Sequence, residues 1–312
     1  MRYFVTGGAG FIGSHLVDKL VNTGLVTVYD NLSSGKQEFI QHHLDREGFR
    51  FIQADLLERD RLAGAMKDSE VVFHLAANPK IRAGTQDTEL DLKQGTIATY
   101  NVLEAMRLNG IKKIVFASTS AVYGETSGQP IPEDYGPLQP ISLYGASKLA
   151  SEGLITAFGH LFSMQAWVFR LANVVGTRAT HGVIIDFIAK LKQNSAELEI
   201  LGDGTQEKSY IHADDCVAGL LYGFKYANDT VNVFNLGNSD ATSVTTIGHM
   251  LIKGMGLANV RLKYTGGNRG WPGDVPQVRL DTLRMEKLGW KPKYTSDEAI
   301  RQTIKNILER SD

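Results

Sequence analysis

The chain begins Met1-Arg-Tyr-Phe-Val-Thr-Gly-Gly-Ala-Gly-Phe-Ile-Gly13, a short apolar run that leads directly into glycines three residues apart. In such a turn Gly7 allows the chain to reverse, and Gly10 lets a pyrophosphate approach backbone N–H groups. Gly13 lets the following helix pack closely against a sheet. The spacing is G-x-x-G-x-x-G rather than G-x-G-x-x-G, and by itself it also fits a plain strand-to-helix turn. The stretch predicts a strand, a helix over Phe11–Val21 and a dinucleotide site between them.

Outward from this turn, apolar runs of four to six residues alternate with amphipathic stretches, the pattern of a parallel sheet with helices on both faces. The predicted strands are Arg2–Thr6, Val26–Asp30, Phe49–Gln53, Val71–Leu75, Lys113–Ser118, Ala166–Arg170 and Val231–Leu236. Further helices are predicted over Thr99–Leu108 and Lys148–Phe158. The alternation weakens after Arg170. We therefore expect a doubly wound α/β domain over 1–172, rejoined by 213–247, and a smaller interleaved C-terminal domain over 173–212 and 248–312 that binds the substrate.

Composition narrows the class of protein. The 312 residues carry a net charge of −1, so no basic field favours nucleic acid or an anionic membrane as a partner. The single cysteine, Cys216, excludes an intrachain disulfide and fits a reducing compartment. We find no signal segment and no apolar run of membrane-spanning length. The sequence predicts a cytoplasmic protein without a nucleic-acid or membrane partner.

Asp30 closes the second predicted strand, where a carboxylate can hold the adenosine ribose hydroxyls of a dinucleotide. A carboxylate there repels a 2′-phosphate, so the residue favours NAD over NADP, although a strand-end turn residue is the alternative reading. The other expected cofactor contacts lie in the glycine turn and just after the first four strands. They are Gly7, Gly10, Phe11, Ile12, Gly13, Asn31, Ser33, Ser34, Gly35, Asp55, Leu56, Leu75, Ala76 and Ala77.

Tyr144 and Lys148 are four residues apart, so on a helix they share one face; Tyr144 alone among eleven tyrosines has a lysine at that spacing. A free tyrosine has a pKa of about 10 and is a weak base at neutral pH. A nearby ammonium and a positively charged nicotinamide ring would favour the phenolate, and lowering the pKa by roughly 3 units requires about 4 kcal/mol. Thr119, at the end of the fifth strand, can hydrogen-bond the reacting oxygen. We expect hydride chemistry with Tyr144 as the proton-transferring group.

Together these stretches resemble the extended short-chain dehydrogenase/reductases, most closely the UDP-glucose (UDP-galactose) 4-epimerases. The resemblance covers essentially the whole chain. Besides Thr6–Gly13, it rests on Tyr29-Asp-Asn-Leu-Ser-Ser-Gly35, Val122-Tyr-Gly124, Tyr144-Gly-Ala-Ser-Lys148, Arg170-Leu-Ala-Asn173, Gly202-Asp-Gly-Thr-Gln206, Tyr210-Ile-His212, Pro272-Gly-Asp-Val275 and Leu288-Gly-Trp-Lys-Pro292.

The resemblance implies a Rossmann-type sheet with a smaller nucleotide-sugar-binding domain, tightly bound NAD and a UDP-sugar substrate. Tyr144 would be the catalytic base, Lys148 its electrostatic partner and a ligand of the nicotinamide ribose, and Thr119 the catalytic hydroxyl. The implied substrate contacts are Ser118, Thr119, Tyr144, Asn173, Lys208, Arg269, Asp274 and Val278. A homodimer through helices near 91–109 and 144–160 is also implied.

Three features depart from the family pattern. Gly95 stands where relatives usually carry an asparagine near the cofactor, and the segment between Gly24 and Asp30 is one residue shorter. The spacing around Arg269 is one residue longer than in some relatives.

Thr119 is followed by Ser120 and Ala121, whereas relatives that eliminate water or remove a carboxylate place acidic residues there. The simplest remaining chemistry is oxidation at C4 and re-reduction on the opposite face, which interconverts UDP-galactose and UDP-glucose. The small Val278, expected near the hexose, predicts some activity on UDP-N-acetylhexosamines. The alternatives are UDP-glucuronate 4-epimerisation, another NAD-dependent nucleotide-sugar oxidoreductase, or a dinucleotide-sensing protein without catalysis.

The histidines do not predict a metal site. His42-His43 is the only adjacent pair, and no cysteine or third ligand accompanies it in the sequence.

Overall fold

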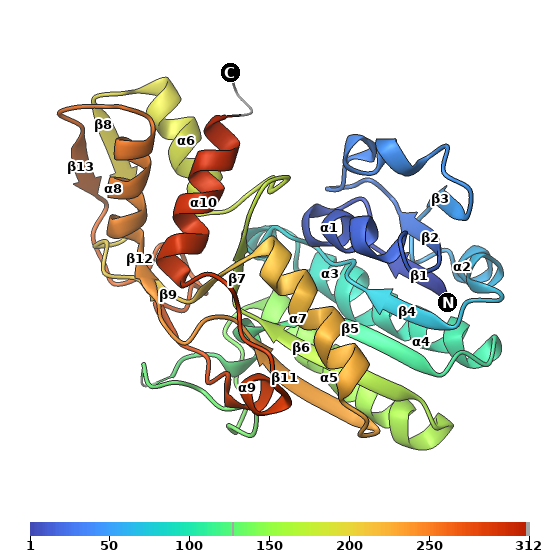
Figure 1. Ribbon diagram of the computed structural model, residues 1–312. Coiled ribbons are helices and arrows are strands. Elements are labelled where there is room, and N and C mark those ends of the chain that lie inside the picture. The colour runs from blue at the N-terminus through green and yellow to red at the C-terminus, as the bar shows by residue number, and fades with distance from the viewer. Residues whose placement is uncertain (127, 310–312) are drawn as a thin grey trace.

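A seven-stranded parallel sheet, in the order β11-β6-β5-β4-β1-β2-β3, forms the centre of the computed structural model, which describes residues 1–126 and 128–309 (Figure 1). Its strands are β1 (Arg2–Thr6), β2 (Leu25–Asp30), β3 (Phe49–Gln53), β4 (Val71–His74), β5 (Lys113–Thr119), β6 (Gln165–Leu171) and β11 (Val231–Leu236). The doubly wound sheet is thereby confirmed, and the predicted strands differ from the observed ones by at most one residue at either end. Successive strands are added on one side of β1 up to β3 and on the other side from β4 onwards, so the strand order reverses between β1 and β4. Ligands of such sheets bind at the carboxyl ends of the strands at this point.

Helices cover both faces of the sheet (Figure 1). One face carries α1 (Phe11–Leu20) and α7 (Ala213–Tyr226), and the other carries α2 (Arg59–Met66), α4 (Ala98–Leu108) and α5 (Leu143–Phe162). Alternate β1 residues enter the two cores, Val5 on the α1 side and Phe4 on the α2 side, and both are fully buried. Burying such a side chain contributes roughly 1.5–3 kcal/mol, so residues on both sides of each strand stabilise the layers.

A second lobe has a core of its own. In it α6 (Val183–Gln193), α8 (Val244–Gly254) and α10 (Ser296–Leu308) pack around β8 (Glu197–Ile200) and β13 (Arg261–Tyr264), at the left of Figure 1. The segments that join this lobe to the sheet are β7 (Asn173–Val175), β9 (Glu207–Lys208), β10 (Tyr210–His212), β12 (Thr242–Ser243), β14 (Gln277–Val278) and α9 (Leu283–Leu288). Met285 and Trp290 belong to the core on the α1 side of the sheet, although they fall in the stretch that we assigned to the substrate-binding domain.

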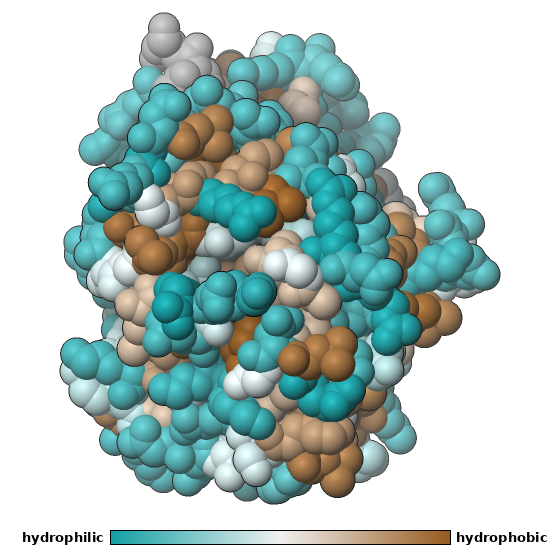
Figure 2. All heavy atoms as spheres, turned by 90° about the vertical axis from the view of Figure 1, so that its right-hand side faces the viewer, coloured by the Kyte–Doolittle hydropathy of each residue, from teal (hydrophilic) through white to brown (hydrophobic). Residues whose placement is uncertain are grey.

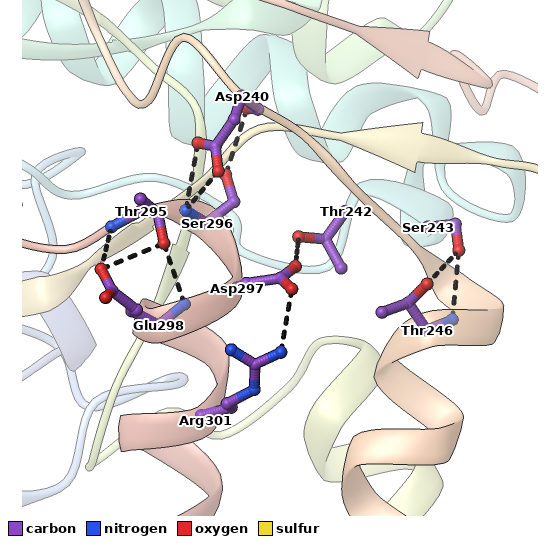
Figure 3. Close-up of polar contacts among 9 residues, drawn as sticks. All are labelled: Asp240, Thr242, Ser243, Thr246, Thr295, Ser296, Asp297, Glu298 and Arg301. Atoms are coloured by element: carbon purple, nitrogen blue, oxygen red, sulfur yellow. Dashed lines mark hydrogen bonds and ion pairs between the residues drawn. The ribbon is translucent and has the colours of Figure 1, made fainter.

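The first turns of α8 and α10 are fixed by side-chain caps (Figure 3). Thr295 and Glu298 form a reciprocal capping box at α10, and Ser243 accepts a hydrogen bond from the Thr246 N–H at α8. Asp240 accepts from the Ser296 N–H at 3.1 Å, and Thr242 donates to Asp297 at 2.7 Å. Each cap typically contributes about 1 kcal/mol to its helix. The contacts of Asp240 and Thr242 also attach the C-terminal helix to the segment before α8.

The helix that the sequence predicts at Thr99 is preceded by a short α3 (Thr88–Asp91) and a π-helical stretch, η4 (Leu92–Ile97). Gly95 lies in this stretch against α5: a Cβ built on it would be 2.5 Å from the Ser147 Oγ. A larger side chain at residue 95 therefore has no room unless Ser147 moves.

The 3-10 segments are η1 (Gln37–Phe39), η2 (Gln41–His43), η3 (Ile81–Thr85) and η5 (Ser120–Tyr123). Among the described residues, every helix falls short of the length or apolar character needed to cross a bilayer. On the side of the molecule that lies at the right of Figure 1, apolar side chains reach the surface in small groups between polar ones (Figure 2).

Candidate active site

The glycine turn between β1 and α1 brings backbone segments so close together that side chains would not fit. Gly7 has φ +70°, and a Cβ on it would lie 2.7 Å from the Ala76 amide nitrogen. A Cβ on Gly13 would lie 2.0 Å from the Gly7 carbonyl oxygen, so only glycine lets α1 begin this close to β1. The helix has Gly10 as its N-cap, without a side-chain cap and without an acidic residue in its first turn. Its first N–H groups, those of Phe11 and Ile12 included, are thus placed to bind an anion such as a pyrophosphate.

Asp30 ends β2 beside this turn. Its carboxylate accepts hydrogen bonds from the Ala9 N–H at 3.0 Å and the Leu32 N–H at 2.9 Å. Burial raises the pKa of Asp30, and the two backbone hydrogen bonds act in the opposite direction. Because Lys36 also donates its N–H to the Ala9 carbonyl at 2.9 Å, the loop of Asn31, Ser33, Ser34 and Gly35 is fastened to the glycine turn.

The ends of β3 and β4 complete this edge of the sheet. Asn31 donates to the Asp55 carboxylate at 2.8 Å, and the backbone carbonyl of the buried Leu56 accepts from Asn101 at 3.0 Å. Leu75, Ala76 and Ala77 follow β4 and are half-buried beside Gly7. The structure therefore brings the predicted cofactor residues to one edge, and the glycine cradle, the free helix N-terminus and the Asp30 carboxylate fit a dinucleotide without a 2′-phosphate.

His74, the last residue of β4, has a structural role. Its ring nitrogens meet the Thr6 hydroxyl at 2.7 Å and the Thr99 hydroxyl at 3.0 Å. Complete burial, reinforced by the positive charge of Lys148, lowers its pKa to about 3. The imidazole is therefore neutral and ties β1 to α4.

Tyr144 and Lys148 lie one turn apart in α5, as predicted, next to the end of β5. Ser142 caps the helix by accepting from the Gly145 N–H at 3.1 Å. A Cβ on Gly145 would lie 2.7 Å from the Ala121 carbonyl oxygen, so this glycine lets the helix start directly against η5. Lys148 is 3% exposed, donates to the Ala117 carbonyl at 2.7 Å and lies 6.0 Å from the centre of the Tyr144 ring.

The electrostatics of Tyr144 differ from the expectation in one respect. Burial raises its pKa to about 12, a hydrogen bond with Thr119 opposes this effect, and the negative charge of Asp91 adds to it. Burial also lowers the pKa of Lys148 to about 8, against the charges of Glu152 and Asp91, so its amine is still protonated at neutral pH. In the cofactor-free chain burial therefore dominates the pKa of Tyr144, and the joint lowering of this pKa by Lys148 and a nicotinamide ring stays a prediction.

A buried ion pair joins α5 to the neighbouring strand β6. The Arg170 guanidinium contacts the Glu152 carboxylate at 2.8 Å, and both side chains are less than a tenth exposed. Ser118 donates to the same carboxylate at 2.5 Å and is itself 2% exposed. Ser118, which we expected to contact the substrate, therefore belongs to this buried network. Sequence reasoning singled out neither Glu152 nor its pairing, although Glu152 follows Lys148 by four residues on the same helix face.

The candidate substrate residues gather around Asp274. Its carboxylate accepts from Lys208 at 2.5 Å and from the Gly270 N–H at 3.1 Å, and its carbonyl accepts from Arg269 at 3.2 Å. A Cβ on Gly273 would lie 3.2 Å from the Ile141 carbonyl oxygen. This turn therefore rests against the segment that leads into Tyr144.

Arg269 also pairs with Glu125, which the sequence analysis missed, and both line a cavity of about 380 Å³. Gln277 lines the cavity, whereas Val278 is 8% exposed and packs in the main core. The exposed Asn173 lies beside Tyr210 in the pairing of β7 and β10. The structure thus gathers Lys208, Arg269 and Asp274, and turns the Val278 side chain into the protein.

Comparisons with known proteins agree with this geometry. A sequence profile described as the NAD dependent epimerase/dehydratase family matches residues 3–237. The chain is 34% identical, over 96% of both chains, to a putative UDP-glucose 4-epimerase of Methanocaldococcus jannaschii.

Two solved structures share the whole fold. A UDP-galactose 4-epimerase is 40% identical with a TM-score of 0.89, and 99% of each chain is covered. A point mutant of UDP-glucuronic acid 4-epimerase from Bacillus cereus, in complex with UDP-4-deoxy-4-fluoro-glucuronic acid and NAD, is 29% identical with a TM-score of 0.90. That match covers 99% of this chain and all of the other. The chain therefore belongs to the NAD-dependent epimerase/dehydratase family, as an epimerase-type isomerase whose cofactor is NAD.

Proposed function

We propose that the protein interconverts UDP-galactose and UDP-glucose by transient oxidation at C4 of the hexose. The observation that carries the proposal is the position of Tyr144, with its hydrogen bond to Thr119, at the end of β5, two strands from the glycine turn at the same carboxyl edge of the sheet. A phenol, a hydroxyl and a dinucleotide at one edge are the parts that reversible alcohol oxidation needs.

Bound NAD supplies reversible hydride exchange with C4. Tyr144 Oη takes the proton of the C4 hydroxyl and later returns one to the same oxygen on the other face of the sugar. Thr119 hydrogen-bonds that oxygen in both steps. Lys148, fixed on the Ala117 carbonyl, keeps a positive charge below the phenol and offers further N–H donors to the nicotinamide ribose.

The cofactor is held by the residues around the glycine turn. The α1 N-terminus binds the pyrophosphate, and the Asp30 carboxylate binds the adenosine ribose. Asn31, Ser33, Ser34, Gly35, Asp55 and Leu56 line the adenosine end, and Leu75, Ala76 and Ala77 line the middle.

Lys208 and Arg269 are our candidates for the diphosphate of the substrate, with Asn173 beside them. Both cations are paired with acids, Lys208 with Asp274 and Arg269 with Glu125. The charge of Glu125 is balanced by Arg269, so this pair does not distinguish a neutral hexose from a glucuronate. The higher identity to UDP-glucose and UDP-galactose 4-epimerases than to the UDP-glucuronic acid 4-epimerase supports a neutral hexose over glucuronate. We also propose some activity on UDP-N-acetylhexosamines, although Val278 does not support it, because its side chain packs in the main core.

Two further features complete the proposal. Tyr100, Leu108 and Leu161 are large apolar side chains exposed on α4 and α5, at 38%, 63% and 74%, and we propose that they pair with a second copy of the chain. We also propose a cytoplasmic location, since the single cysteine, Cys216, is buried and cannot form an intrachain disulfide.

The proposal is tested by initial rates with UDP-galactose, UDP-N-acetylgalactosamine and UDP-glucuronate on one enzyme preparation. We expect the highest kcat/KM with UDP-galactose and the lowest with the uronate; the reverse order would favour the glucuronate alternative. Tyr144→Phe should lower kcat about 10²–10⁴-fold. Tyr226→Phe, on the exposed surface of α7, is the matched control and should leave kcat unchanged.

A further inference from the structure

A cluster of two histidines and one aspartate lies at the far end of α1 from the glycine turn. Asp18 is in α1, and His42 and His43 are in η2. The Nε2 atoms of His42 and His43 lie 2.9 and 2.8 Å from the same oxygen, Asp18 Oδ1. Within residues 1–126 and 128–309, this is the one group of three or more potential metal-ligand side chains whose ligand atoms all lie within 4.8 Å of one another.

From this convergence we propose that Asp18, His42 and His43 bind a divalent transition-metal ion of the zinc class. The third ligand that the histidine pair lacks in the sequence is supplied by the fold, because η2 is packed on α1. Two imidazoles and one carboxylate suit Zn²⁺ and leave a fourth tetrahedral position for water.

The distances are close to those of a tetrahedral site. Metal–ligand bonds of about 2.0–2.2 Å place neighbouring ligand atoms about 3.3–3.5 Å apart. The two contacts of 2.8 and 2.9 Å must therefore open by about 0.5 Å when the ion replaces the shared protons. Such a change is within reach of side-chain rotation, since the His42 side chain is 51% exposed.

The surrounding residues orient two of the three ligands. The Arg178 guanidinium lies 2.8 Å from the other Asp18 oxygen, Oδ2, and so leaves Oδ1 facing the histidines. The His43 ring is packed against Phe49, with 5.5 Å between ring centres, and its side chain is 8% exposed. Burial acts to raise the pKa of Asp18, but the hydrogen bond from His43 and the charge of Arg178 outweigh it and keep the carboxylate ionised. The positive charge of Arg178 also opposes the cation, so we expect moderate affinity.

The site would connect two segments that carry cofactor residues. α1 begins at the glycine turn, and η2 follows the Asn31–Gly35 loop, which is itself attached to that turn through Lys36 and Ala9. An ion at Asp18 would join the same two segments at their other end. Because an ion that binds the folded state stabilises it by mass action, a higher thermal midpoint with Zn²⁺ is expected.

The experiment is a titration of the full-length, chelator-treated protein with ZnCl2 by calorimetry, accompanied by the visible spectrum with CoCl2. We expect one ion per chain, the intense visible bands of tetrahedral Co²⁺, and affinity at least about tenfold weaker in His42→Ala. The matched control is His249→Ala, which removes an exposed histidine from α8 and should leave the affinity unchanged.

Arg178→Gln removes the opposing charge and should tighten Zn²⁺ binding, while Asp18→Asn should weaken it. Equal Zn²⁺ affinity in the wild type, His42→Ala and Asp18→Asn would overturn the proposal. So would the absence of saturable binding to the wild type. Neither outcome depends on epimerase activity, so the metal site and the proposed function are tested separately.

Discussion

Lys148→Met should stabilise the fold and abolish catalysis, because Lys148 keeps an ammonium group in the protein interior. The pKa of this lysine falls from 10.5 to about 8 in the folded chain. At about 1.4 kcal/mol per pH unit, this corresponds to roughly 3 kcal/mol of cost at neutral pH. Methionine has a similar length and no charge, but it leaves the Ala117 carbonyl without its donor, a loss of about 1 kcal/mol. The net expectation is a gain of about 1–2 kcal/mol in the free energy of unfolding.

The direction in which stability changes with pH follows from proton linkage. The unfolded state binds more protons than the folded state between pH 8 and 10.5, so the free energy of unfolding of the wild type rises with pH over that window. The advantage of Lys148→Met should therefore be largest below pH 8 and should shrink towards pH 10.5.

The assay is the thermal midpoint of the cofactor-free wild type and variant across this range. Domains of 150–250 residues shift by about 2–4 °C per kcal/mol, so a rise of a few degrees is expected near neutral pH. Lys19→Met, at an exposed position of α1, is the control and should change stability by less than about 0.5 kcal/mol. A destabilised Lys148→Met variant, or an advantage that does not vary with pH, would refute the reasoning.

Three further variants test other parts of the structure. Gly13→Ala places a Cβ 2.0 Å from a backbone oxygen and should abolish co-purification of NAD, seen in the spectrum of the released nucleotide. Gly153→Ala, where a Cβ meets nothing within 4 Å, should retain NAD, and a Gly13→Ala protein that still carries it contradicts our account of the turn. Arg170→Met leaves Glu152 charged and buried without its partner and should cost about 3–5 kcal/mol in chemical unfolding, whereas a loss below about 1 kcal/mol would show that the pair is unimportant. Asp30→Asn removes the charge that repels a 2′-phosphate, so the ratio of NADP to NAD affinity should rise in a binding titration; an unchanged ratio argues against the role of Asp30.

Local sequence was sufficient for the sheet and for the glycine turn. The strands are buried on both faces and therefore stand out as apolar runs, and the glycines are required by backbone contacts a few residues apart. The pair Tyr144 and Lys148 was equally clear, because a helix of regular geometry places residues four apart on one face.

Long-range contacts account for what sequence reasoning missed. Ser118 sits next to Thr119 in the chain, yet alternation along β5 turns it towards Glu152, on a helix 34 residues later. The pairing of Glu125 with Arg269 joins segments more than a hundred residues apart, and Val278 packs in the core from a short strand whose partner, β9, lies about seventy residues earlier in the chain. The third member of the histidine cluster, Asp18, is supplied by a helix that precedes the pair by 24 residues.

The burial of Tyr144 could not be read from the sequence either. Spacing alone suggests that Lys148 lowers the tyrosine pKa, but the structure half-buries Tyr144 and buries Lys148, and loss of solvation then dominates the pKa of each.

The most direct test of the proposed function is incubation of the purified protein with UDP-galactose, with chromatography of the nucleotide sugars and simultaneous near-ultraviolet absorbance. Our account predicts that UDP-glucose accumulates to an equilibrium mixture without a lasting rise in reduced nicotinamide, and that Tyr144→Phe does not form it at a comparable rate. Unchanged UDP-galactose in the presence of added NAD, or stoichiometric accumulation of reduced nicotinamide, would contradict it.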